Sequence, residues 1–277
     1  MGELASYDHD LLMCNIKTQF CLARMSYNDN LFDNDDIIGE YVHDLAYEDT
    51  LGKYDELPDS VFDNCRIIEN ISTKRGLQCL IVSFEQNGIK KYSVVFRGTE
   101  SGCDWAHDLY TIKSKLKKGV YVHGGFFKQL QSESSIDRIV KVLKKHIHMN
   151  DTCYLTGHSL GAGLATITAY ILANVFSNLN VHWNLVTFGS PRVGNKQFAI
   201  EVDSNPLITH LRVYDRLDPI NYVPVYNYFH SGIKIQFCPS TRKWEIGTGI
   251  QNTATPSWYK RRRSYHLCSH YHDILDA

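Results

Sequence analysis

The sequence predicts an α/β fold in which a mostly parallel central sheet is flanked by helices. Strand-like and helix-like segments alternate through the middle of the chain, which is the order that a parallel sheet with crossover helices requires. One strand-like run leads through a Gly-x-Ser-x-Gly turn directly into a long apolar helix. The 277 residues fit one α/β domain, and no repeat, low-complexity tract or linker divides them. We therefore expect a single domain over residues 1–277.

The first third of the chain contains a predicted helix and a predicted hairpin. Apolar residues at helical spacing favour a helix over residues 10–27, and a polar, turn-rich break follows at residues 28–36. Residues 77–84 and 91–96 are β-rich, and an Asn-Gly pair lies between them. Because Asn and Gly both tolerate a positive φ, this pair favours a hairpin turn.

The middle of the chain alternates between helices and strands. Residues 132–148 carry apolar side chains on one helical face and basic residues in the last turns, where cations interact favourably with the helix dipole. Residues 160–177 are expected to form a second, longer apolar helix. Strands are expected at residues 152–156, 184–188, 209–214 and 233–237.

The turn that precedes the long apolar helix indicates a nucleophilic serine. Gly157-His158-Ser159-Leu160-Gly161 has the Gly-x-Ser-x-Gly pattern of a nucleophile elbow. The two glycines are small, so the strand and the helix can approach each other closely, and the tight turn projects the serine hydroxyl above the sheet. The helix that follows directs its free N–H groups at the reacting carbonyl. Ser159 is therefore the expected nucleophile.

Together with this elbow, four segments resemble the class 3, fungal-type triacylglycerol lipases. In chain order they are Val95-Phe96-Arg97-Gly98-Thr99, Asp104-Trp105-Ala106-His107-Asp108-Leu109, Val122-His123-Gly124-Gly125-Phe126 and Phe188-Gly189-Ser190-Pro191-Arg192-Val193-Gly194-Asn195. The resemblance covers roughly residues 77–275, whereas residues 1–75 resemble nothing specific beyond an N-terminal helix. It implies an α/β-hydrolase fold with a short lid over the active site.

Two downstream acids are candidates for the carboxylate of a catalytic triad. A serine hydroxyl needs a histidine to take its proton, and the histidine needs a carboxylate to orient it and to stabilise its cation. In this fold the chain order is serine, aspartate, histidine. Asp218 falls on the aspartate of the family's Asn-x-x-Asp-x-Val-Pro pattern and is the expected acid. Asp215, where the family often has Asn, is the alternative.

The C-terminal segment offers three candidates for the histidine, namely His266, His270 and His272. The family has a histidine followed a few residues later by a tyrosine and an apolar helix. His266, with Tyr271 after it, fits this pattern best, and the other two remain as alternatives. His230, which resembles a histidine before a family strand, is expected to be structural.

An oxyanion hole is expected beside the nucleophile. The residue after the nucleophile, Leu160, supplies one backbone N–H, and one such donor contributes on the order of 10²–10³ in rate. By resemblance, Thr99 supplies a second N–H and its hydroxyl, which Asp108 holds in place. His158, within the elbow, is expected to support the site.

The substrate expectation depends on the segment that resembles a lid. Residues 100–111, which include Trp105, resemble the family's lid helix over an apolar cleft, and an amphipathic lid would open at a lipid surface. We therefore expect hydrolysis of acylglycerol or related lipid esters, with transient contact to a lipid surface. A phospholipase A1 or a generic esterase is the alternative. A non-catalytic signalling or scaffold relative is a further alternative, which the loss of a triad member would mark.

Charge, hydropathy and cysteine usage limit the partners and the setting. The formal net charge of −1 gives no long-range attraction to nucleic acid, and no apolar stretch reaches the ~20 residues of a transmembrane helix. The N-terminus has no signal-peptide pattern, and the eight cysteines contain no Cys-x-x-Cys pair, so we expect reduced thiols and an intracellular setting. Secretion, with a leader missing from this chain, is the alternative. No organic cofactor and no metal are expected. A structural zinc at the C-terminal histidines and Cys268 is an alternative whose spacing is unlike the usual ligand pairs.

Overall fold

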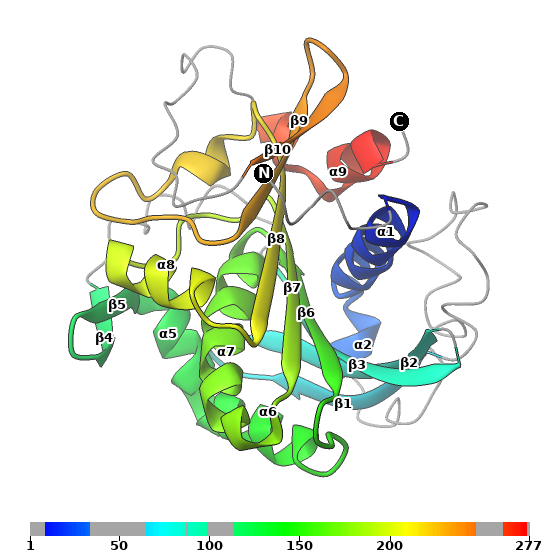
Figure 1. Ribbon diagram of the computed structural model, residues 1–277, viewed down its shortest axis with the longest axis vertical. Coiled ribbons are helices and arrows are strands. Elements are labelled where there is room, and N and C mark those ends of the chain that lie inside the picture. Colours follow the sequence, from blue (N-terminus) through cyan, green and yellow to red (C-terminus); the bar gives the residue numbers. More distant parts are fainter. Residues whose placement is uncertain (1–8, 34–64, 87, 99–112, 248–262, 276–277) are drawn as a thin grey trace.

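The computed structural model describes residues 9–33, 65–86, 88–98, 113–247 and 263–275, and these residues are built around one large sheet (Figure 1). Its eight strands lie in the order β1-β2-β3-β6-β7-β8-β9-β10. Adjacent strands from β3 to β9 run parallel, and the pairs at both edges run antiparallel. The strands are β1 (Arg66–Ser72), β2 (Gln78–Gln86), β3 (Ile89–Phe96), β6 (Thr152–His158), β7 (His182–Phe188), β8 (Ile208–Asp215), β9 (Ile233–Cys238) and β10 (Lys243–Gly247).

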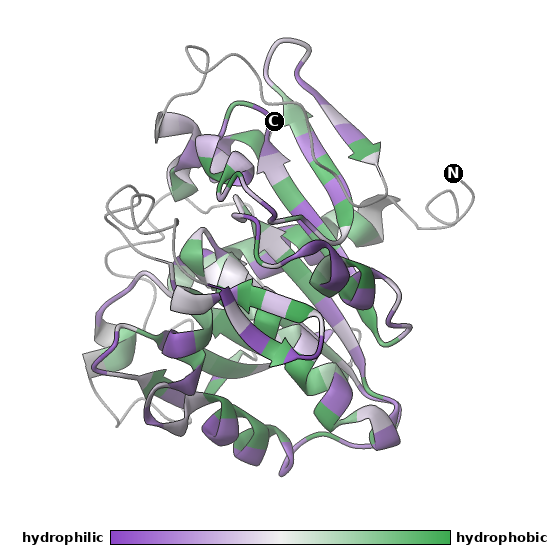
Figure 2. Ribbon diagram, turned by 90° about the vertical axis from the view of Figure 1, so that its left-hand side faces the viewer, coloured by the Kyte–Doolittle hydropathy of each residue, from purple (hydrophilic) through white to green (hydrophobic). Residues whose placement is uncertain are grey.

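Helices cover both faces of this sheet, as the sequence predicts (Figure 1). One face packs against α5 (Gly124–Gln131), α6 (Ser135–Leu143), α7 (Leu160–Val175) and α8 (Lys196–Asp203). The other packs against α1 (His9–Met25), α2 (Asn30–Asp33) and α9 (Cys268–Leu275). Strand β9 alternates apolar and polar residues, which Figure 2 shows as green and purple bands. None of the helices in the described part of the chain has the length and apolar character needed to cross a membrane.

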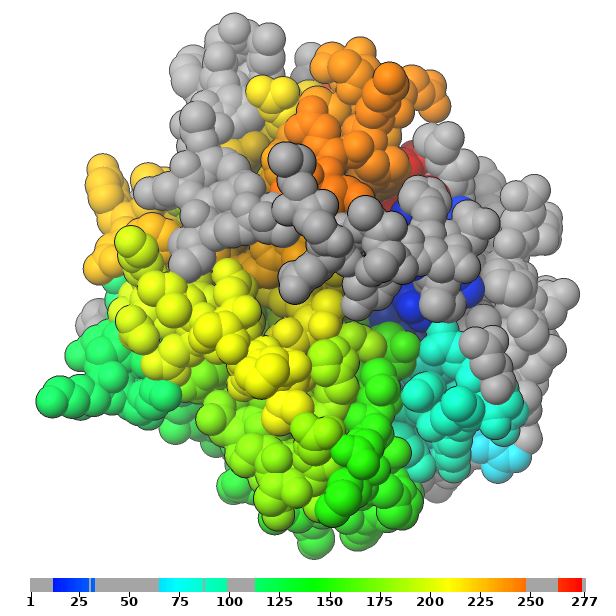
Figure 3. Space-filling model, viewed as in Figure 1, coloured from blue at the N-terminus to red at the C-terminus, as the bar shows by residue number. Residues whose placement is uncertain are grey.

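A two-stranded sheet of β4 (Lys113–Lys117) and β5 (Val120–His123) projects from the molecule beside α8 (Figures 1 and 3). The side chain of Asn195 ties this hairpin to the main body. Its amide Nδ2 donates to the carbonyl oxygen of Gly119 (2.8 Å), and its Oδ1 accepts from the backbone N–H groups of Tyr121 and Phe198 (3.1 Å each). Asn195 therefore caps α8 and fixes the hairpin with one side chain.

Most of the predicted elements are present with shifted ends. The hairpin of β2 and β3 places Gln86 opposite Ile89, and the four predicted central strands correspond to β6, β7, β8 and β9. The predicted helix over 132–148 is shorter: Glu133 and Ser134 adopt left-handed φ values of 48° and 56° within a 3₁₀ turn, so α6 begins at Ser135, and it ends at Leu143. The single domain over residues 1–277 stays a prediction.

The start of α7 lies against the ends of two strands, and glycine makes this approach possible. A methyl group on Gly161 would collide with the carbonyl group of Phe96 in β3, and one on Gly157 would collide with the backbone of Gly161. A methyl group on Gly163, two residues further along, would instead meet the ring of Phe126 at 2.6 Å. The backbone contacts fix where the helix begins relative to the sheet, and so where Ser159 stands.

We expect Gly161→Ala to lower the free energy of unfolding by about 1–3 kcal/mol, since overpacking against backbone cannot be relieved by a rotamer change. Alanine favours the helix by about 1 kcal/mol over glycine, which offsets part of this loss. Gly163→Ala is the matched control on the same helix, where only a side chain must move. Urea unfolding of both variants measures the difference, and equal stabilities would contradict the argument.

Three buried histidines make the stability of the fold depend on pH. Burial lowers the pKa of His158 and His230 well below the usual value, and it lowers that of His210 to about 3. After burial, the charge of Arg212 also lowers the pKa of His210 and His230, because it opposes their protonation. In the folded protein these rings therefore stay neutral at pH values where a histidine in an unfolded chain, with a pKa near 6.5, takes up a proton.

The free energy of unfolding is therefore expected to fall as the pH drops below about 6.5 towards the folded pKa values, by up to about 1.4 kcal/mol per pH unit for each histidine. Urea unfolding at pH 7, 6 and 5 measures this slope. His210→Gln should reduce the slope by up to one proton, whereas a change of the exposed His148 to Gln should leave it unchanged. Equal stability at pH 7 and pH 5 would rule out the buried neutral state.

Candidate active site

Ser159 occupies the sharp junction between β6 and α7. Its backbone has φ 59° and ψ −124°, a region that non-glycine residues rarely adopt. Its N–H donates to the carbonyl oxygen of Phe188 at the end of β7 (3.0 Å), and its own carbonyl accepts from Ala162 in the first turn of α7 (3.1 Å). The strand and the helix thus hold the strained residue from both sides. The side chain lies above the carboxyl ends of the parallel strands.

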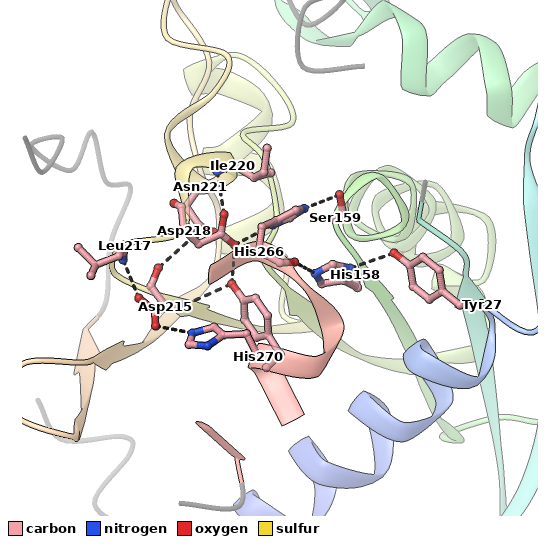
Figure 4. A network of polar contacts seen from close by, with 11 residues as sticks. Tyr27, His158, Ser159, Asp215, Leu217, Asp218, Ile220, Asn221, His266 and His270 are labelled. Carbon is pink, nitrogen blue, oxygen red and sulfur yellow. Dashed lines mark hydrogen bonds and ion pairs between the residues drawn. The ribbon is translucent and has the colours of Figure 1, made fainter. Parts of the chain in front are cut away.

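The three residues predicted as a triad lie in one line of hydrogen bonds (Figure 4). The Ser159 hydroxyl and Nε2 of His266 are 2.8 Å apart, and Nδ1 of the same ring is 2.8 Å from Oδ2 of Asp218. His266 comes from the 3₁₀ turn η8 (Arg263–His266), and Asp218 comes from the turn that follows β8. With Nδ1–H donating to the carboxylate, Nε2 is left to accept the hydroxyl proton.

Each oxygen of the fully buried Asp218 has a donor. Oδ1 accepts from the backbone N–H of Ile220 (2.8 Å), so Asp218 caps the 3₁₀ turn η6 (Pro219–Tyr222). Oδ2 accepts from His266 and also from the hydroxyl of Tyr271 (2.7 Å). Burial, and after it the charge of Asp218, raises the pKa of Tyr271 well above its usual value, so this hydroxyl remains a donor. From the sequence, Tyr271 served only to identify His266 as the base, and no contact with Asp218 was predicted for it.

The structure separates His266 from the other candidates for the base. His270 points at Asp215, with Nε2 2.7 Å from Oδ2, and the second oxygen of Asp215 accepts from the N–H of Leu217 (2.6 Å). His272 lies 3.5 Å from the neighbouring, exposed Asp273. His230 is buried and donates through Nε2 to the carbonyl of Asn221 (2.6 Å), which is a structural contact. His266 is thus the candidate that contacts Ser159.

His158 supports His266 from the side of the elbow. The two rings stack with centroids 4.7 Å apart, and Nε2–H of His158 donates to the backbone carbonyl of His266 (2.8 Å). Its Nδ1 accepts from the hydroxyl of Tyr27 (2.9 Å). Burial and then the charge of His266 lower the pKa of His158 well below its usual value, so it stays neutral. Tyr27 follows α1 and was not predicted, because no motif covers that part of the chain.

The surroundings of Gly189 explain why the Gly-Ser-Pro-Arg segment begins with a glycine. Its φ is +54°, and a methyl group there would lie 2.9 Å from Oδ2 of Asp218 and 3.1 Å from Cε1 of His266. The absence of a side chain therefore lets β7 end directly against the acid and the base. Leu160 is the first residue of α7, where backbone N–H groups have no partner within the helix. The predicted residues Thr99, Trp105 and Asp108 lie outside the described residues.

The C-terminal histidines each contact a different carboxylate, and they do not converge on a shared metal site. Within the described ranges, no group of three His, Cys, Asp or Glu side chains is arranged to hold a metal ion. The Cys268 side chain is half-buried, and desolvation of its thiol raises the pKa to about 12. Independence from metals and cofactors stays a prediction.

Sequence relatives support the interpretation of these motifs. The family model described as Lipase (class 3) matches residues 93–228, a segment that contains the elbow and Asp218. A rice phospholipase A1-II 1 (Oryza sativa subsp. indica) is 28% identical over 169 residues, which are 53% of this chain and 43% of that protein. A lipase of Rhizopus niveus is 30% identical over 166 residues, 57% of this chain and 42% of that protein. The chain thus spans less than half the length of these curated relatives.

Solved structures show the same fold. Lipase II from Rhizopus niveus superposes with a TM-score of 0.72 at 19% identity, covering 93% of this chain and 94% of that one. A Rhizomucor miehei lipase in complex with its propeptide gives a TM-score of 0.70 at 20% identity, covering 95% and 79%. Residues 93–228 thus match the class 3 lipase family, and the chain shares the α/β-hydrolase fold of these solved fungal lipases.

Proposed function

We propose that this protein hydrolyses carboxylic esters of lipids through Ser159, His266 and Asp218. The observation that carries the proposal is the unbroken line of hydrogen bonds from the Ser159 hydroxyl through both ring nitrogens of His266 to Asp218. The class 3 lipase family and the names of the relatives, lipase and phospholipase A1, support the choice of lipid esters.

The proposed reaction has two stages. In the first, His266 takes the Ser159 proton at Nε2 while the serine oxygen attacks the carbonyl carbon of the ester, and Asp218 stabilises the imidazolium. The tetrahedral intermediate then expels the alcohol, which takes the proton from His266. The acyl group remains bound to Ser159. In the second stage, water attacks this acyl group with His266 again as the base. The fatty acid leaves, and the serine recovers its proton.

Negative charge on the carbonyl oxygen needs donors that are already in place. Leu160 N–H at the start of α7 supplies one in this proposal, and the partial positive charge of the helix N-terminus acts in the same direction. Thr99 supplies the other, with Asp108 holding its hydroxyl, which follows from the family pattern. Leucine suits this position because only its backbone is used.

The substrate class is proposed as acylglycerols or related lipids, with phospholipase A1 activity as the alternative. Leu267, directly after the base, leaves about half of its side chain exposed (54%), and an apolar residue at that place favours contact with a lipid surface. A non-catalytic scaffold is disfavoured because none of the three triad residues is missing or displaced.

We also propose a reducing, intracellular setting. The buried thiols of Cys65 and Cys153 support it, since burial raises their pKa to about 12.

Ser159→Ala and His266→Ala should each abolish turnover of p-nitrophenyl butyrate, since loss of the nucleophile in a serine protease costs on the order of 10⁶ in kcat. His272→Ala is the matched control and should retain most activity, because that ring pairs with the exposed Asp273. A fluorophosphonate should label the wild-type serine and not Ser159→Ala. Turnover above about a hundredth of wild type in clean, folded Ser159→Ala would refute the proposed function.

The lid expectation gives a second test, on substrate length. If Trp105 covers the acyl groove, Trp105→Ala should reduce kcat/KM for oleate esters more than for butyrate esters, since a long chain gains about 0.8 kcal/mol per buried CH₂. Asp108→Asn is the control: it should reduce both alike, because every ester uses the oxyanion hole. Equal losses on the two substrates for Trp105→Ala would reduce the proposal to a generic esterase.

A further inference from the structure

A second aspartate–histidine pair lies next to the triad and takes no part in the proposed reaction. Asp215, the last residue of β8, is fully buried, and its Oδ2 is 2.7 Å from Nε2 of His270 on α9. The His270 side chain is 21% exposed and packs edge-on against the ring of Tyr265, with centroids 5.0 Å apart. The pair therefore has one end in the core and the other partly exposed; Figure 4 shows both side chains close to the triad.

Tyr271 joins this pair to the triad. Its hydroxyl accepts from the backbone N–H of Asp215 (3.3 Å) and donates to Oδ2 of Asp218 (2.7 Å), the same oxygen that accepts from His266. Both carboxylates also raise the pKa of this hydroxyl, after the larger effect of burial. Asp215 and Asp218, which are three residues apart in the chain, thus both interact with the buried Tyr271 hydroxyl.

Two buried carboxylates this close are costly unless each has a counter-charge. In a low-dielectric interior, like charges repel strongly, and an uncompensated carboxylate stabilises any nearby cation. During the proposed reaction Asp218 is balanced by the imidazolium of His266. Asp215 has only His270 to balance it among the described residues within ion-pair distance. The turn itself does not need a charge at Asp215, because an amide oxygen would also accept from the N–H of Leu217.

We propose that Asp215 and His270 are positioning residues that balance their own charges and so set the pH range in which His266 works as the base. This inference rests on the proposed function. The groups that face His266 in the described structure are Ser159, Asp218, the neutral His158 and the Tyr271 hydroxyl, with Asp215 and His270 behind that hydroxyl. When His270 carries a proton, the pair has no net charge, and the triad experiences little field from it.

The sign of each substitution follows from this charge balance. His270→Gln keeps an N–H donor for Asp215 but removes the positive charge, so the lone carboxylate favours the imidazolium of His266. The acid limb of the kcat/KM profile, which reports the base in the free enzyme, should then move to higher pH by about half a unit or more. Adding Asp215→Asn to His270→Gln removes the lone charge, and the limb should return close to its wild-type position.

The experiment is a kcat/KM profile on p-nitrophenyl butyrate from pH 5 to 9 for wild type, His270→Gln and the double variant. His272→Gln is the matched control on the same helix and should leave the limb in place. A limb that does not move in His270→Gln, or that the second substitution does not restore, would overturn the proposal, since a purely structural pair would lower activity at every pH. If His270→Gln does not fold, Asp215→Asn alone decides: a limb at or below the wild-type pH supports the proposal, and one above it contradicts it.

Fluorophosphonate titration of active sites distinguishes this inference from the proposed function. A wild-type protein that neither reacts nor hydrolyses esters would refute the function itself. Active wild-type protein with an unmoved limb in His270→Gln would refute only the role of the pair. The pH dependence of the labelling rate should shift in the same direction as kcat/KM, because labelling also requires His266 as the base.

Discussion

The backbone of Ser159 is the constraint on which the rest of the site depends. A left-handed φ at a non-glycine residue costs of order 1–3 kcal/mol, and it persists only where the surroundings determine it. Here the hydrogen bond to Phe188 and the close contacts of Gly157 and Gly161 leave the junction no relaxed alternative. The strain is thus sustained by the packing of α7 on β3, β6 and β7. That packing also aims the hydroxyl at the place where the carboxyl ends of the strands converge.

The acid and the base reach this place through elements that leave the sheet. Asp218 is fixed because it caps η6 and bonds Tyr271, and His266 is fixed because its backbone carbonyl accepts from His158. Apart from the cap, these contacts join segments distant in the chain: Asp218 and Tyr271 are 53 residues apart, and His158 and His266 are 108 apart. The bond from Tyr27 to His158 spans 131 residues. The site is therefore a product of the whole fold, although its nucleophile belongs to a five-residue motif.

The central part of the fold could be predicted from the sequence because its signals are local and strong. Strands β6, β7 and β8 each contain several apolar residues, helix α7 is apolar along most of its length, and the elbow joins β6 to α7. Strand β4 escaped prediction because four of its five residues are polar, and β10 escaped because its alternation of polar and apolar residues lasts for only five residues. The helix over 132–148 was drawn too long, because its apolar periodicity continues across the left-handed residues Glu133 and Ser134 and beyond the end of α6.

The residues of the site also differ in how strongly the local sequence identifies them. Ser159 and Asp218 follow from a motif and from the chain order, whereas three histidines within seven residues offer almost the same chemistry. Only their partners across the fold distinguish them: His266 meets Ser159, His270 meets Asp215, and His272 lies beside Asp273. Tyr27 could not be found at all from the sequence, because its role is a single hydrogen bond made by a residue type that is common in cores.

The side chains around the triad have fixed protonation states. Burial keeps His158 neutral and Tyr271 protonated, and it raises the pKa of the Cys268 thiol to about 12. These neighbours therefore hold one charge state across the pH range in which an enzyme works. In the proposed reaction the proton moves between Ser159, His266 and the substrate, and His266 carries it beside a carboxylate whose oxygens are already bonded. Because no neighbouring group must change its charge or reorient when the imidazolium forms, little reorganisation energy is spent at the moment of attack.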